Sequence, residues 1–165
     1  MDGTFGFLTV NQWLAVLRIG IGLWWLKSFL HKPHQKFVSG QMVGWTVALA
    51  ENHPVPAFGR AIKGLVAPNG SWFPYLVLAG ELAVALGMIF GFLTPITLII
   101  AIFLNLNYLL LAGFRPKDIT INAAYQCEQG QNWNMIVAEV VLFFTLAASG
   151  CTFSIDHALG LFCGI

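Results

Sequence analysis

The chain has 165 residues, of which 58% are hydrophobic and only 9% are charged, and its formal net charge is +1. Soluble domains carry about 25% charged residues, so this composition excludes a soluble enzyme domain, and the small net charge gives no support for a nucleic-acid partner. A lipid bilayer instead requires an apolar protein surface. We therefore predict an all-α integral membrane protein whose surroundings are the lipid bilayer.

The first predicted transmembrane helix covers about residues 12–30. About 20 apolar residues cross the ~30 Å hydrocarbon core at 1.5 Å per residue, and this run is long enough. No basic segment precedes the run and no small-residue cleavage site follows it. We therefore expect a retained span and not a removed signal peptide.

A long connection follows, over about residues 31–71, and it contains two apolar stripes at helical spacing. The break between them is Asn52-His53-Pro54. The stripes predict two short amphipathic helices, which either lie at the membrane interface or pack as a lid on the bundle; the two arrangements are compatible. The stripes consist of Val38, Met42, Trp45 and Leu49, and of Phe58, Ile62, Leu65 and Val66.

Three further predicted spans cover about residues 72–90, 95–112 and 133–149. The turn between the second and third spans is so short that these helices must be antiparallel neighbours. Asn132 is placed to cap the fourth span. The sequence therefore predicts a single domain, residues 1–165, folded as a four-helix membrane bundle with short interfacial helices.

The Lys and Arg residues predict the orientation of the bundle. They lie in or beside the first and third connections, which the positive-inside rule places in the cytoplasm, so both termini are expected on the exterior or periplasmic side. The residues concerned are Lys27, Lys32, Lys36, Arg60, Lys63, Arg115 and Lys117.

Two of the three cysteines, Cys151 and Cys163, fall on the predicted exterior side, where a disulfide is possible. Two free thiols are the alternative, and we favour it. Cys127 falls on the reducing side and is expected to be a loop thiol.

Each predicted span carries one polar group: Arg18, Glu81, Asn105 and Glu139. At 1.5 Å per residue the last three fall near the bilayer midplane, and Arg18 falls about one turn toward the exterior. Because lipid does not solvate such groups, they are expected to face the bundle interior, and ionisable residues there are functional candidates.

This polar layer has two interpretations. One arginine faces two carboxylates and can bind one of them with two hydrogen bonds, which leaves the other carboxyl less compensated. A carboxyl that holds its proton can serve a quinone or a proton relay. The alternative is a satisfied polar layer that only fixes helix register.

Two other features are assigned weaker roles. Gly80, Gly87 and Gly91 predict a seam on the second span that permits close helix packing. His31 and His34 are weak candidates for a metal or pigment site, because no carboxylate or cysteine lies near them in the sequence. We favour contact with lipid headgroups for these histidines and predict no metal site.

Taken in order, several stretches resemble the DoxX/DoxD-like family of four-helix membrane proteins. The resemblance covers nearly the whole chain, including the long first connection. The stretches that carry it are Arg18 with Trp24, Trp25 and Lys27; Ala79-Gly80-Glu81 with Gly87, Gly91 and Thr94-Pro95; Asn105-Leu106-Asn107-Tyr108; Ala148-Ser149-Gly150; and Ser154-Ile155-Asp156.

The resemblance implies a membrane subunit associated with redox chemistry, in a bacterial or archaeal inner membrane. DoxD-like proteins form the membrane subunit of a thiosulfate:quinone oxidoreductase. For this chain it implies an electron-transfer subunit that touches the quinone pool, while no catalytic residue of that enzyme is transferred here.

A second hypothesis is a non-catalytic accessory subunit of a large respiratory or photosynthetic complex. The chain has little extramembrane mass, and its Phe-rich faces suit partner helices, lipid or carotenoid. A transporter or channel is a third possibility, although four spans offer little room for a pore and no inverted repeat is evident.

Overall fold

A computed structural model describes residues 4–114, 125–146 and 151–162. This part of the chain is almost entirely helical, as predicted. A short antiparallel hairpin, β1 (Thr4–Phe5) and β2 (Leu8–Thr9), precedes the first helix. The helices are α1 (Val10–His31), α2 (His34–Lys36), the π-helical turn η1 (Phe37–Gln41), α3 (Met42–Glu51), α4 (Pro56–Val66), α5 (Phe73–Phe90), α6 (Thr94–Ala112), α7 (Tyr125–Phe144) and α9 (Ile155–Ala158).

Within the described residues, three helices are long and apolar enough to cross a membrane: α1, α5 and α6. They have 22, 18 and 19 residues, which correspond to about 27 to 33 Å at 1.5 Å per residue. Their bounds agree within two residues with the first three predicted spans. These three helices indicate a multi-pass membrane protein.

Helix α7 is also long, with 20 residues, but its N-terminal half is polar and rich in Gln and Asn. The predicted fourth span overlaps its C-terminal half, and residues 147–149 of that span lie outside the described residues. The prediction that Asn132 caps this helix is wrong, because α7 begins seven residues earlier. Asn132 instead lies inside the helix and donates to the Glu128 carbonyl oxygen at 2.7 Å.

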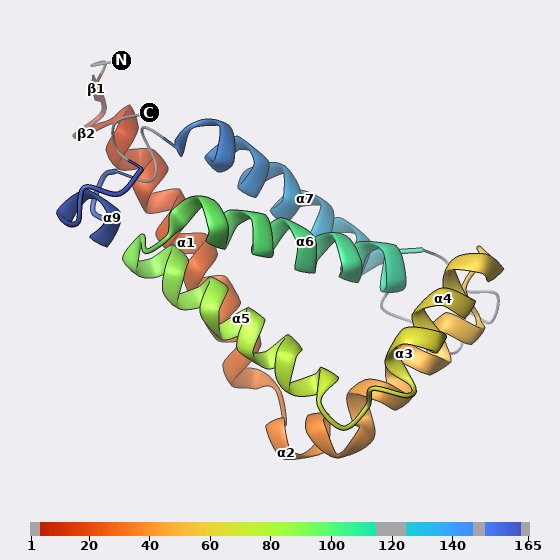
Figure 1. Ribbon diagram of the computed structural model, residues 1–165. Coiled ribbons are helices and arrows are strands. Elements are labelled where there is room, and N and C mark those ends of the chain that lie inside the picture. The colour runs from red at the N-terminus through yellow and green to blue at the C-terminus, as the bar shows by residue number, and fades with distance from the viewer. Residues whose placement is uncertain (1–3, 115–124, 147–150, 163–165) are drawn as a thin grey trace.

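The long helices pack as two pairs, α1 with α5 and α6 with α7, which the short turn between α5 and α6 connects (Figure 1). The predicted antiparallel arrangement of α5 and α6 is confirmed. The described C-terminal segment lies near the start of α1 and this turn, at the end of the bundle opposite to α3 and α4. The core between the pairs is apolar and contains Trp25, Val84, Met88, Leu98 and Leu142.

Helices α3 and α4 are the two short helices predicted in the first connection. They pack against each other closely, because a Cβ atom at Gly59 would collide with the Ala50 carbonyl oxygen. The His53 side chain at their junction is buried and joins them to α6: its Nε2 lies 2.8 Å from the Leu110 carbonyl oxygen, while its Nδ1 accepts from the Val55 amide at 3.1 Å. This contact ties the connection to the bundle, whereas its depth in the membrane stays a prediction.

Replacing His53 by Ala removes the hydrogen bond to α6 and is expected to loosen the α3–α4 pair. A net hydrogen bond contributes about 1 kcal/mol, so the effect should be local opening and not global unfolding. Hydrogen–deuterium exchange should quicken in residues 42–66 and stay unchanged in α5. Equal acceleration in both regions, or in neither, would contradict this assignment.

The predicted glycine seam on α5 is only partly a close-packing surface. A Cβ atom at Gly87 would collide with the Thr97 side chain of α6, and one at Gly91 would collide with the Arg18 side chain. Gly80 has room, since its Cβ position meets only Leu104 Cδ1 at 3.6 Å. The seam therefore acts near the turn between α5 and α6 and not at Gly80.

This difference predicts opposite effects for two identical substitutions. Gly87→Ala should lower the free energy of unfolding by about 1–3 kcal/mol, because the added methyl group overpacks the contact between α5 and α6. Gly80→Ala should raise it by about 0.5–1 kcal/mol, because alanine favours the helix. Unfolding by sodium dodecyl sulfate in mixed micelles measures both, and a loss of stability in both variants would show that the spacing at Gly80 is also critical.

Candidate functional site

Glu139 on α7 lies fully buried between α1 and α6. Its Oε1 accepts a hydrogen bond from Trp25 Nε1 at 3.1 Å, and both carboxylate oxygens accept from Asn105 Nδ2, at 2.9 and 3.0 Å. All three side chains are 0% exposed. The carboxylate thus links three long helices through neutral donors, and Asn105 Oδ1 beside it has no hydrogen-bond partner among the described residues.

Glu81 on α5 forms a second buried cluster. Lys32, just after α1, places its Nζ 2.6 and 2.7 Å from the two carboxylate oxygens, and the Tyr108 hydroxyl of α6 donates to Oε1 at 2.6 Å. Glu81 is fully buried, whereas the Lys32 side chain is 22% exposed. Hydrogen bonds therefore connect a partly exposed amine to two side chains in the bundle interior.

Arg18 on α1 is also fully buried, but its described hydrogen bonds go to backbone oxygens and not to Glu81 or Glu139. Its Nη2 donates to the carbonyl oxygens of Thr152 and Phe153 at 3.2 and 2.7 Å. Within the described residues, its Nε and Nη1 have no hydrogen-bond acceptor. Arg18 therefore holds the C-terminal segment against α1.

Asp156 on α9 completes this arrangement by capping α6. Its carboxylate accepts from the amides of Leu93 and Thr94 at 2.8 Å each and from the Thr94 hydroxyl at 2.6 Å. Its own amide donates to the Gly91 carbonyl oxygen at 2.9 Å. A carboxylate at a helix N-terminus satisfies otherwise unpaired amides and interacts favourably with the helix dipole.

The structure thus divides the predicted polar layer into three clusters. Asn105 and Glu139 contact each other, Glu81 pairs with Lys32 and Tyr108, and Arg18 contacts the C-terminal segment. The expected pairing of Arg18 with Glu81 or Glu139 is wrong. Arg18 Nη2 donates to the C-terminal segment, and Lys32 forms the ion pair with Glu81.

His31 and His34 do not converge on one point. His31 Nδ1 lies 2.9 Å from the Lys27 carbonyl oxygen, and His34 Nε2 lies 2.8 Å from that of Phe29. Among the described residues, no group of three or more His, Cys, Asp or Glu side chains lies close enough together to hold a metal ion. These histidines therefore hold the end of α1 and the start of α2.

Cys151 is disulfide-bonded. The favoured expectation of a free thiol at this position is therefore wrong. Cys163 and the side chain of Cys127 lie outside the described residues, as do Arg115 and Lys117. The disulfide adds a covalent constraint next to Thr152, whose carbonyl oxygen Arg18 binds.

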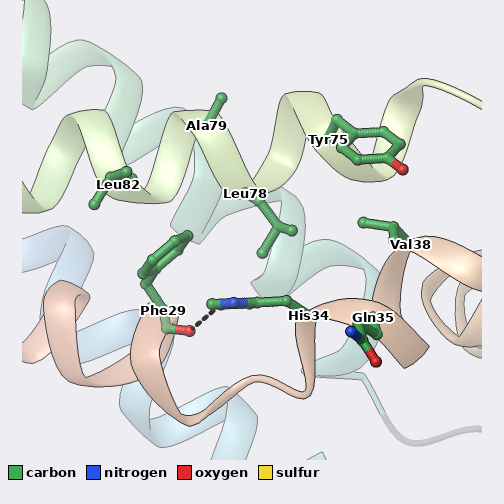
Figure 2. Close-up of a pocket in the computed structure, with 8 residues that line it drawn as sticks. All are labelled: Phe29, His34, Gln35, Val38, Tyr75, Leu78, Ala79 and Leu82. Atoms are coloured by element: carbon green, nitrogen blue, oxygen red, sulfur yellow. Dashed lines mark hydrogen bonds between the residues drawn. The ribbon is translucent and has the colours of Figure 1, made fainter.

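Two apolar grooves lie on the described surface. The first, of about 350 Å³, lies between α5 and the region where α1 leads into α2 and η1 (Figure 2). The second, of about 360 Å³, lies between α5 and α6 near their turn. Glu81, Asn105 and Glu139 line neither groove. The first groove is lined by Phe29, His34, Gln35, Val38, Tyr75, Leu78, Ala79 and Leu82.

Four residues with no specific role predicted from the sequence prove important: Lys32, Tyr108 and Asp156 in or next to these clusters, and His53 at the junction of α3 and α4. Lys32 was read only as an orientation signal, and Tyr108 and Asp156 only as parts of the family resemblance. Lys32 and Glu81 lie 49 residues apart in the sequence, and no sequence pattern pairs a cation with a carboxylate at that separation. Asp156 lies two residues after Ser154, and an acidic residue in the first turn after a serine cap is a helix-start signal, although for α9 and not for α6.

Comparisons with protein-family models, with curated proteins and with solved structures gave no match to this chain. The resemblance to DoxX/DoxD-like proteins therefore remains a prediction from the sequence.

Proposed function

We propose that this chain is a four-span membrane subunit of a quinone-linked redox complex in a bacterial or archaeal inner membrane, similar to DoxX/DoxD-like proteins. The observation that carries this proposal is the cluster of Lys32, Glu81 and Tyr108. Quinone reduction takes up protons as well as electrons, so a subunit beside a quinone needs groups that exchange protons between the membrane surface and the interior.

In this proposal α7 is the fourth span. It packs along α6 and places Glu139 on its buried side, while Val137, Val141 and Phe144 are 48%, 47% and 81% exposed. An inward carboxylate with outward apolar side chains suits a helix between lipid and a polar interior. Because α7 returns along α6, the C-terminal segment lies near the start of α1. Four membrane crossings require this, since an even number of crossings leaves both ends on the same side.

Quinone retention by the purified protein tests this role. We expect the wild-type protein, extracted in a mild detergent, to carry quinone in near-stoichiometric amount when measured by chromatography. Glu81→Gln should lose most of it, because the substitution removes the charge that holds the Lys32 and Tyr108 donors in place. Glu51→Gln is the matched control, since Glu51 pairs with Lys63 on the exposed surface. Absence of quinone from the wild type and its complex, or unchanged retention in Glu81→Gln, overturns the proposal.

A second function, a non-catalytic accessory subunit of a large respiratory or photosynthetic complex, is favoured by a different observation. The polar clusters are enclosed by the chain itself, and the outer faces of α5 and α6 carry large exposed apolar side chains that suit partner helices, lipid or carotenoid. Examples are Phe90, Ile99 and Phe103, which are 53%, 55% and 62% exposed.

Gentle affinity purification distinguishes the two functions. An accessory subunit should bring large partner subunits with it in fixed stoichiometry and show no turnover of its own. Purification of the chain alone, with turnover of an electron donor, would exclude the accessory role.

A further inference from the structure

The first groove runs along the N-terminal half of α5. Its lining residues on this helix extend from Tyr75 to Leu82, about 10 Å at 1.5 Å per residue. Figure 2 shows Phe29 and Leu78 pointing into the space from opposite walls, with Val38 facing Tyr75 at one end. Apolar side chains form most of the lining, and the volume lies within the range of about 300–1,000 Å³ found for small-molecule sites.

The two ends of this groove differ in chemical character. Tyr75 and the nearby Trp72 are 57% and 51% exposed, and such aromatic residues gather at the level of lipid headgroups. Gln35 also lines this region. Leu82 lies two turns further along an apolar helix that is long enough to cross the membrane. If the exposed aromatic residues mark the headgroup level, the groove leads from there along α5 toward the hydrocarbon, which is the direction that a lipid acyl chain takes.

The chain around the headgroup end is positively charged. Residues 27–50 contain three lysines and no acidic residue. Lys32 is neutralised by Glu81, while neither Lys27 nor Lys36 forms an ion pair within the described residues. Lys36 is exposed and directly follows Gln35 on α2. An anionic group at this end of the groove would therefore meet an uncompensated cation.

The second groove provides an internal comparison. It has a similar volume, and its lining is apolar except for Thr97. Neither groove is lined by a Lys or Arg side chain, and Arg18 at the second groove's end of the bundle is buried and bound to the C-terminal segment. Both grooves suit an acyl chain by shape, but only the first has a lining residue, Gln35, that is directly followed by an exposed lysine without an ion pair among the described residues, Lys36.

We propose that the first groove is a binding site for an anionic phospholipid. One acyl chain lies between α5 and the α1–α2–η1 wall, and the phosphate lies at the end formed by Gln35, Lys36 and Tyr75. The inference requires only a membrane environment, so it stands independently of the quinone-linked function.

Native mass spectrometry with added phosphatidylglycerol and phosphatidylcholine of identical acyl chains tests this site. The wild type is expected to retain phosphatidylglycerol about fivefold better, the effect of one lysine near an anionic headgroup. Lys36→Gln should abolish this preference and leave phosphatidylcholine retention unchanged. Ala79→Trp, an exposed position that lines the groove, should reduce retention of both lipids by filling the space.

Two control variants locate the effect. Arg60→Gln removes an exposed positive charge on α4, away from the groove, and Ile96→Trp fills the second groove instead of the first. Neither should alter the phosphatidylglycerol preference. Equal retention of the two lipids by the wild type, the same loss in Arg60→Gln as in Lys36→Gln, or full retention in a folded Ala79→Trp variant would each overturn the proposal.

Discussion

Replacing Asp156 by Ala is expected to lower the free energy of unfolding by about 3 kcal/mol. The substitution removes three hydrogen bonds, of which two satisfy the amides of Leu93 and Thr94 at the start of α6. Loss of a charged cap costs about 0.5–2 kcal/mol, and a buried donor left unpaired adds about 1–3 kcal/mol. Unfolding by sodium dodecyl sulfate in mixed micelles, followed by circular dichroism, measures the change.

A matched control uses the second cap in the same segment. The Ser154 side chain accepts from the His157 amide at 3.1 Å, but this bond caps only the short, exposed helix α9. Ser154→Ala should therefore cost about 0.5 kcal/mol, at the low end for cap removal. If Asp156→Ala costs no more than Ser154→Ala, the C-terminal segment does not stabilise the turn between α5 and α6.

Replacing Glu81 by Leu is expected to cost about 2–4 kcal/mol, because it leaves Lys32 Nζ and the Tyr108 hydroxyl without their shared acceptor. Removing one member of a buried charge pair costs about 2–5 kcal/mol, and the partial exposure of Lys32 reduces the penalty. Chemical unfolding in mixed micelles gives the value. Tyr108→Phe should cost only about 1 kcal/mol, since it removes a single hydrogen bond.

A double-mutant cycle separates this coupling from other effects of the substitution. Lys32→Met together with Glu81→Leu removes both charges, so the double variant should recover much of the stability that Glu81→Leu loses. If the double variant instead loses as much stability as the two single variants together, the ion pair does not couple α1 to α5. Glu51→Gln, which breaks a solvent-exposed pair, should change the stability by less than about 1 kcal/mol.

The sequence predicted the helices well because their signals are local. Apolar runs of sufficient length place α1, α5 and α6 within two residues of their observed bounds. The break at Asn52-His53-Pro54 separates α3 from α4 as expected. Helix α7 was less well placed, because its polar first half carries no hydrophobic signal although it continues the same helix.

The partners of the polar side chains were harder to predict. Counting residues along a helix gives the depth of a side chain but not the neighbouring side chain that it contacts. The rise per residue predicts similar depths for Asn105 and Glu139, and these two side chains are in contact. It predicts a comparable depth for Glu81, but Lys32 reaches back from the end of α1 to bind it. A long flexible side chain spans more than one helical turn. The position of a lysine along the helix therefore does not determine where its charged group lies.

Arg18 shows most clearly why side-chain partners could not be predicted from the sequence. Its acceptors lie 134 and 135 residues later in the chain, in a segment with no apolar periodicity. Only the folded arrangement shows that this segment returns to the start of α1. The carboxylates were the expected partners because an arginine in a span usually pairs with an opposite charge, whereas here its Nη2 donates to two backbone oxygens.

The cap on α6 also constrains the order in which the molecule can be completed. Asp156 lies 62 residues after Thr94, whose amide it binds. During synthesis, α6 is therefore made and can enter the membrane well before its cap exists, and the intervening segment that contains α7 must emerge first. The cap on α6 can form only after Asp156 has left the ribosome, so a chain that stops after α7 would contain α1, α5, α6 and α7 yet lack the hydrogen bonds that hold the turn between α5 and α6.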